Sequence, residues 1–271
     1  MPNSRALPTV LAFSICLACT GCNQPGTALS PAVKAAIDDG LSEVSLDVLP
    51  PGMYPQVMRL KDGKTLRYAL YVPDGYEQTK GAPLVLSLHF SAGRRRGGPV
   101  SPYYGGVMLE RLVQPALGEL NAVMIAPDSI GGGWSSKANE DAVLAVMDHI
   151  IEKYDIDRRK VLVTGFSMGG AGTWHFAQKF PQRFSAAIPM AARPGRDVDL
   201  KIPAYVIHSR ADELIPIASV EAYVQQLQAA GCQVQFLAVD GISHRETERF
   251  RAPLRQAVPW VNEIWSASGD G

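Results

Sequence analysis

Hydrophobic residues along this chain fall into short runs and longer periodic stretches that alternate with one another. The short runs have the length of strands, and they cover 84–88, 122–126, 161–164, 186–189, 204–208 and 234–239. The runs over 84–88 and 122–126 have the composition of buried strands. The longer stretches carry apolar residues at helical spacing, near 107–120, 139–154, 171–180, 217–230 and 246–265. Strands alternating with helices form parallel crossovers, so the pattern predicts an α/β fold with a mostly parallel sheet and helices on both faces. Asn139 is a candidate N-cap for the second helix.

A different pattern precedes these strands. Residues 57–60 and 66–72 have the alternation of half-buried strands, and the segment between them contains Asp62-Gly63, a pair typical of tight turns. This predicts an antiparallel N-terminal hairpin at the edge of the sheet. We expect hairpin and parallel strands to form one domain over residues 54–267, since α/β folds of this size are commonly one domain.

The first 53 residues differ from the rest. An apolar run over 10–18 follows the basic residue Arg5, and it is too short to span a bilayer as a helix. It resembles a secretory signal peptide, and Cys19-Thr20-Gly21-Cys22 resembles a bacterial lipobox. We therefore expect a signal peptide over 1–21, lipid attachment at Cys22 and a tether over 22–53, so that the protein is exported and anchored to the bacterial cell envelope. Cys19 is a second candidate for the lipid, and an ordinary cleaved signal or an uncleaved anchor is the alternative.

Composition narrows the possible partners. The chain has 271 residues, 26 Lys and Arg and 26 Asp and Glu, and its formal net charge of +0 gives no overall field that would attract nucleic acid. We expect no nucleic-acid partner. Cys232 is the one cysteine outside the N-terminal segment, so no intradomain disulfide is available and we expect Cys232 to pack as a small apolar residue.

The most informative short pattern is Gly165-Phe166-Ser167-Met168-Gly169-Gly170, which has the form G-x-S-x-G. A β-branched strand precedes it and a helical stretch follows it, which is the context in which a serine sits on a sharp turn. Glycines on either side allow the backbone to pass closely there. The N-terminus of the helix favours negative charge beside the serine. Ser167 is therefore the candidate nucleophile.

Two further residues follow later strands, where functional loops of a parallel sheet are found. Asp212 comes after the strand over 204–208, and His244 comes after the strand over 234–239. A serine hydroxyl is a weak nucleophile, so His244 would take its proton while Asp212 orients the imidazole. Glu213 or Asp240 is an alternative source of the carboxylate. The remaining histidines are interpreted as structural: His89, His149, His175 and His208. The mechanism needs no cofactor and no metal ion.

In such a reaction negative charge develops on the carbonyl oxygen of the substrate, and an oxyanion hole with two hydrogen-bond donors is required to stabilise it. The Met168 N–H follows the nucleophile and is the first candidate, and the Ser91 N–H, after the strand over 84–88, is the second. Phe90 and Trp134 are candidate substrate-binding residues, with Trp134 either stacking on substrate or packing under its loop. Arg94-Arg95-Arg96 is either a solvated loop or a site for an acidic group of the substrate.

Several segments resemble one group of α/β-hydrolases, which contains esterase D, polyhydroxybutyrate depolymerases and feruloyl esterases. The similar segments are Leu88-His89-Phe90-Ser91, Ala126-Pro127-Asp128, the G-x-S-x-G turn and Pro181-Gln182-Arg183-Phe184. Phe90 departs from the group, which usually has glycine there, and a side chain at this position narrows the approach to the oxyanion loop.

This resemblance implies an α/β-hydrolase fold and a serine esterase that cleaves a small-molecule or polymer-derived ester through an acyl-enzyme intermediate. The alternatives are a peptidase or thioesterase with the same three residues, and a non-catalytic envelope lipoprotein that uses the fold for binding.

Overall fold

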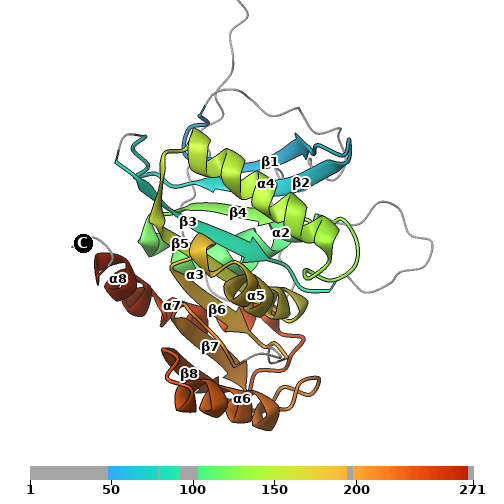
Figure 1. Ribbon diagram of the computed structural model, residues 1–271, viewed down its shortest axis with the longest axis vertical. Coiled ribbons are helices and arrows are strands. Elements are labelled where there is room, and N and C mark those ends of the chain that lie inside the picture. The colour runs from blue at the N-terminus through green and yellow to red at the C-terminus, as the bar shows by residue number, and fades with distance from the viewer. Residues whose placement is uncertain (1–47, 79, 92–102, 194–197, 268–271) are drawn as a thin grey trace, which may run out of the picture.

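The computed structural model describes residues 48–78, 80–91, 103–193 and 198–267 (Figure 1). The predicted signal peptide, Cys19, Cys22 and the tether up to residue 47 lie outside the described residues, as does Arg94-Arg95-Arg96. In the part of the chain that the structure describes, no helix is both long and apolar enough to cross a membrane.

One eight-stranded sheet forms the centre of the fold, with the strand order β1-β2-β4-β3-β5-β6-β7-β8. The strands are β1 (Gly52–Arg59), β2 (Thr65–Val72), β3 (Ala82–Leu88), β4 (Val123–Pro127), β5 (Ile156–Phe166), β6 (Ala186–Met190), β7 (Ala204–Ser209) and β8 (Val234–Val239). The β1–β2 hairpin is antiparallel, β2 pairs antiparallel with β4, and every other pairing is parallel. The predicted mostly parallel sheet with an antiparallel N-terminal hairpin is confirmed.

Helices cover both faces of this sheet, as Figure 1 shows. One face packs against α4 (Lys137–Lys153), α5 (Met168–Lys179) and α6 (Ile217–Ala229). The other packs against α2 (Tyr104–Met108), the π-helix η1 (Leu109–Val113), α3 (Gln114–Leu117), α7 (Arg251–Arg255) and α8 (Val258–Ala267). Strand β3 divides its side chains between the two cores, because successive residues of a strand point to opposite faces. Leu84 and Leu86 enter the first core, whereas Val85 enters the second.

Three short 3-10 helices, η2 (Gly118–Leu120), η3 (Pro181–Arg183) and η4 (Thr247–Phe250), complete the described secondary structure. The stretch predicted as one helix over 246–265 is instead divided into η4, α7 and α8. Pro259 explains the break before α8, since proline lacks an N–H and its ring clashes with the carbonyl group four residues earlier.

The start of α4 also differs from the prediction. Ser136, not Asn139, is the N-cap, and the Ser136 side chain accepts a hydrogen bond from the Asn139 N–H. Asn139 is 1% exposed and its side chain has another function. Its amide group donates to Gly131 O and Gly133 O, at 2.9 Å each, and accepts from the Ile130 N–H at 2.9 Å. Asn139 therefore fixes the loop that leads from β4 into α4.

Candidate active site

Ser167 lies on the sharp turn between β5 and α5, at the carboxyl edge of the sheet. Its backbone has φ +56° and ψ −113°, a left-handed conformation that L-residues rarely adopt and that costs about 1–3 kcal/mol. Close packing beneath the turn requires the flanking glycines. A Cβ atom on Gly169 would lie 1.8 Å from Leu88 O, and one on Gly165 would lie 2.4 Å from Gly169 O. The Ser167 N–H donates to Met190 O at 3.0 Å, which holds the strained turn against β6.

The structure brings Ser167, His244 and Asp212 into one hydrogen-bonded chain. Ser167 Oγ lies 2.8 Å from His244 Nε2, and His244 Nδ1 lies 2.7 Å from Asp212 Oδ2. The other oxygen, Oδ1, accepts from the Leu214 N–H at 2.9 Å and the Ile215 N–H at 2.8 Å. An ionised carboxylate can only accept hydrogen bonds, so the proton between Asp212 and His244 is on Nδ1. His244 Nε2 is then free to accept the serine proton.

Neither alternative carboxylate contacts the imidazole ring. Glu213 accepts from the His244 backbone N–H at 2.9 Å and from Ser243 Oγ at 3.0 Å. The backbone hydrogen bond from His244 is the main cause that lowers the pKa of Glu213. The Asp240 side chain is 84% exposed and pairs with Arg210. Glu213 therefore holds the loop that carries His244, while Asp212 alone among the three carboxylates considered orients the ring.

The end of β3 lies beside this turn, because Leu88 pairs with Gly165 in the parallel register. Phe90 and Ser91 follow β3, and Met168 is the first residue of α5. The side chain of Ser167, the N-cap of α5, makes no capping hydrogen bond, and the N-terminal N–H groups of a helix favour an anion. The Phe90 ring packs edge-on against Tyr104, with 5.8 Å between centroids. Both predicted oxyanion donors thus belong to segments that border Ser167.

The chain is similar to known proteins in sequence and in fold. A sequence model described as the Dienelactone hydrolase family matches residues 126–256. A probable feruloyl esterase C of Aspergillus terreus is 31% identical over 61% of this chain, which spans 62% of that protein. Feruloyl esterase C of Emericella nidulans is 26% identical over 78% of the chain and 70% of that protein. A solved structure titled as a thermostable esterase superposes with a TM-score of 0.62 at 23% identity, covering 78% of this chain and 62% of that one. The chain has the α/β-hydrolase fold.

A second histidine supports Asp212. His208, at the end of β7, is fully buried, and its Nε2–H donates to Ile215 O at 2.8 Å. The same nitrogen lies 3.4 Å from Asp212 Oδ2. Burial lowers the pKa of His208 and so favours the neutral ring. His208 therefore braces the turn of residues 212–215, which agrees with the structural role expected from the sequence.

Trp134 is buried, with 2% of its surface exposed. Its Nε1–H donates to His89 O at 3.0 Å, and its ring lies edge-on to the His89 ring with 5.0 Å between centroids. Of the two interpretations of this residue, its burial favours packing under the loop over stacking on a substrate, because the indole presents almost no surface. Sequence alone could not choose, since both interpretations require an aromatic residue in the same loop.

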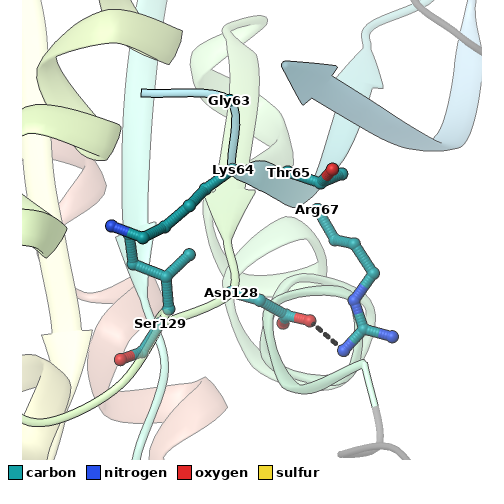
Figure 2. Close-up of a pocket in the computed structure, with 7 residues that line it drawn as sticks. Gly63, Lys64, Thr65, Arg67, Asp128 and Ser129 are labelled. Carbon is teal, nitrogen blue, oxygen red and sulfur yellow. Dashed lines mark ion pairs between the residues drawn. The ribbon is translucent and has the colours of Figure 1, made fainter. Parts of the chain in front are cut away.

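The structure contains a polar groove that no pattern in the sequence indicated. It has a volume of about 490 Å³ and is lined by Ile130 and by six residues that Figure 2 labels, namely Gly63, Lys64, Thr65, Arg67, Asp128 and Ser129. Arg67 and Asp128 form an ion pair at 2.7 Å, and Asp128 Oδ1 accepts from the Gly105 N–H at 2.8 Å. Burial raises the pKa of Asp128. The groove joins the start of β2 to the residues after β4, which meet only because these two strands pair antiparallel.

Among the described residues, no group of three or more His, Cys, Asp or Glu side chains is arranged to hold a metal ion.

Proposed function

We propose that this protein is a serine hydrolase that cleaves carboxylic esters through an acyl-enzyme intermediate on Ser167. The observation that carries the proposal is the continuous chain of hydrogen bonds from Ser167 Oγ through His244 to the buried Asp212 carboxylate. The names of the relatives, feruloyl esterases, support an ester as the substrate class.

In the first half of the proposed reaction, Ser167 Oγ attacks the ester carbonyl carbon while His244 Nε2 takes the hydroxyl proton. The carbonyl oxygen becomes an oxyanion that accepts hydrogen bonds from the Met168 and Ser91 N–H groups. His244 then gives its proton to the departing alcohol oxygen, which leaves the acyl group on Ser167. Asp212 stays ionised throughout and stabilises the imidazolium that forms between the two transfers.

In the second half, water replaces the alcohol. His244 Nε2 takes a proton from a water molecule while the water oxygen attacks the acyl carbon. It then gives that proton to Ser167 Oγ as the acyl–oxygen bond breaks. The products are a carboxylic acid and the free serine. Every proton is carried by His244, so the reaction requires neither a cofactor nor a metal ion.

The proposal is tested by treating the full-length protein with a fluorophosphonate probe and measuring turnover of acetyl, feruloyl and hydroxybutyrate esters beside a peptide amide and a thioester. We expect labelling of the peptide that contains Ser167, and kcat/KM highest for one of the esters. If kcat/KM is highest for the amide or the thioester, the substrate class is that one and not a carboxylic ester. A protein that is neither labelled nor active on any of the five would be a binding protein with a hydrolase fold.

We also propose that residues 54–267 form the hydrolase domain, and that the chain is exported and tethered by a lipid on Cys22 through residues 22–53. The lipobox-like segment ending at Cys22 supports this. In a bacterial host supplied with an alkyne analogue of palmitate, the wild-type protein should incorporate the label and Cys22→Ser should not. Cys19→Ser is the matched control and should incorporate the label normally. If only Cys19→Ser loses the label, Cys19 is the residue that carries the lipid. A wild-type protein without label would contradict lipidation.

A further inference from the structure

We propose that His89 is a positioning residue that sets the orientation of the Phe90–Ser91 peptide group and thereby aims the Ser91 N–H at the oxyanion. The inference rests on the proposed function and deepens it, because it assigns a role to a buried histidine that the reaction itself does not use.

The contacts of the ring fix its protonation. His89 is 3% exposed, with Nδ1 2.6 Å from Phe90 O and Nε2 3.0 Å from the Ser129 backbone nitrogen. A carbonyl oxygen can only accept, so Nδ1 must carry a hydrogen. A backbone N–H can only donate, so Nε2 must present its lone pair. His89 is therefore a neutral imidazole with its hydrogen on Nδ1, and burial, which lowers its pKa, maintains that form.

The bond to Phe90 O determines where the next N–H points. The Phe90 C=O and the Ser91 N–H belong to one planar peptide group, in which the two bonds point in opposite directions. Because His89 holds the C=O toward itself, the N–H is turned to the other side of the peptide. Leu88 is paired with Gly165, so this peptide follows a strand whose end lies beside the Ser167 turn.

His89 is itself held from several directions. Its own carbonyl group accepts from Trp134 Nε1, and its ring packs against Trp134 and against Tyr104 with 5.0 and 5.6 Å between centroids. The Ser129 N–H that reaches its Nε2 belongs to the loop that Asn139 fixes. Phe90 packs on Tyr104 as well, so the peptide is held at its carbonyl oxygen and at the preceding side chain. A rigid surrounding shell of this kind is what a preorganised oxyanion donor requires.

Two substitutions separate the two ring contacts. In His89→Asn, the side-chain amide lies near the former Nδ1 and can still donate to Phe90 O. In His89→Gln, the amide lies near the former Nε2 and can accept from the Ser129 N–H, but it no longer donates to Phe90 O. The two variants remove the same ring and differ in which hydrogen bond they keep. Ester turnover and melting temperature are measured for both in the full-length protein, with His149→Gln on α4 as a control for a histidine outside the site.

We expect His89→Gln to lower kcat by at least about tenfold with KM within about twofold of wild type, because one oxyanion donor is worth about 10²–10³ in kcat and misalignment loses part of that. His89→Asn should stay within about threefold of wild type. The pH dependence of kcat/KM should keep its midpoint in both variants, since His244 and Asp212 are untouched. The inference would be overturned if kcat fell equally in the two variants and in proportion to their loss of melting temperature. It would also be overturned if kcat for His89→Gln equalled that of the wild type.

The wild-type protein gives an independent measurement if neither variant folds. Nitrogen-15 spectra of histidine-labelled protein should show His89 as the neutral form with hydrogen on Nδ1, and a ring with hydrogen on Nε2 would contradict the proposed clamp. The proposed function is tested separately on the wild-type protein. If the wild type neither reacts with fluorophosphonate nor turns over esters, the proposed function is wrong, whatever the His89 variants do.

Discussion

Replacing Ser167 by alanine is expected to lower kcat for ester hydrolysis by about 10⁴- to 10⁶-fold, with any residual rate coming from the oxyanion donors and substrate binding. The substitution removes the atom that forms the acyl bond, and His244 then has no hydroxyl group 2.8 Å from Nε2 to deprotonate. Initial rates on the best ester of the substrate panel measure the effect, and fluorophosphonate labelling should disappear in the same variant.

The fold should survive this change. Serine and alanine meet the same strain at φ +56°, so the left-handed turn is no worse in the variant. Ser219→Ala, at the start of α6, removes a hydroxyl that donates to Pro216 O; it is the matched control and should keep full activity. Ester turnover retained in Ser167→Ala, with a melting temperature equal to wild type, would rule out Ser167 as the nucleophile.

The second large effect is expected for Asp212→Asn, which should lower kcat by about 10⁴-fold. The Leu214 and Ile215 N–H groups donate to Oδ1, so the amide oxygen of asparagine should occupy that position. The amide NH₂ then faces His244 Nδ1 where Oδ2 accepted a hydrogen bond. An NH₂ group donates to Nδ1 and forces the imidazole hydrogen onto Nε2. In that tautomer His244 cannot take the serine proton. A full pH profile measures the loss, which should persist at every pH at which the protein is folded.

Two neighbouring carboxylates provide the controls. Glu213→Gln keeps an oxygen that can accept from the His244 N–H, so its loss in kcat should be below about tenfold. Asp240→Asn changes an exposed side chain and should leave kcat unchanged within about twofold. A loss for Glu213→Gln as large as that for Asp212→Asn would show that the loop contact, and not the ring contact, determines the activity.

Much of the fold was predictable because it depends on local patterns. The buried runs became the parallel strands, and the Asp62-Gly63 pair marked the hairpin of β1 and β2. Glycine at 165 and 169 also marked the turn at Ser167, since no larger residue fits where the backbone of β3 approaches. Patterns of this kind are determined by residues adjacent in the chain.

The less predictable features depend on residues distant in the chain. Ser136 and Asn139 are both good caps, and only the position of the loop over 129–133 assigned one to the helix start and the other to the loop. Trp134 was open to two interpretations until the contact with His89 determined its burial. The contact between His89 and Ser129 and the polar groove each join segments that the strand order brings together.

The sequence by itself determined the class of fold, the candidate nucleophile and the order in which its candidate partners follow, because strand periodicity, close glycine packing and the position after a strand are local properties. The tertiary structure decided which carboxylate contacts the imidazole, since Asp212, Glu213 and Asp240 have the same chemistry and all follow one of the two strands β7 and β8. Only packing, which turns Asp212 inward onto two backbone N–H groups and leaves Asp240 in solvent, distinguishes them. The same packing surrounds His89 with one acceptor and one donor, and so gives a buried histidine a defined hydrogen position that no pattern in the chain records.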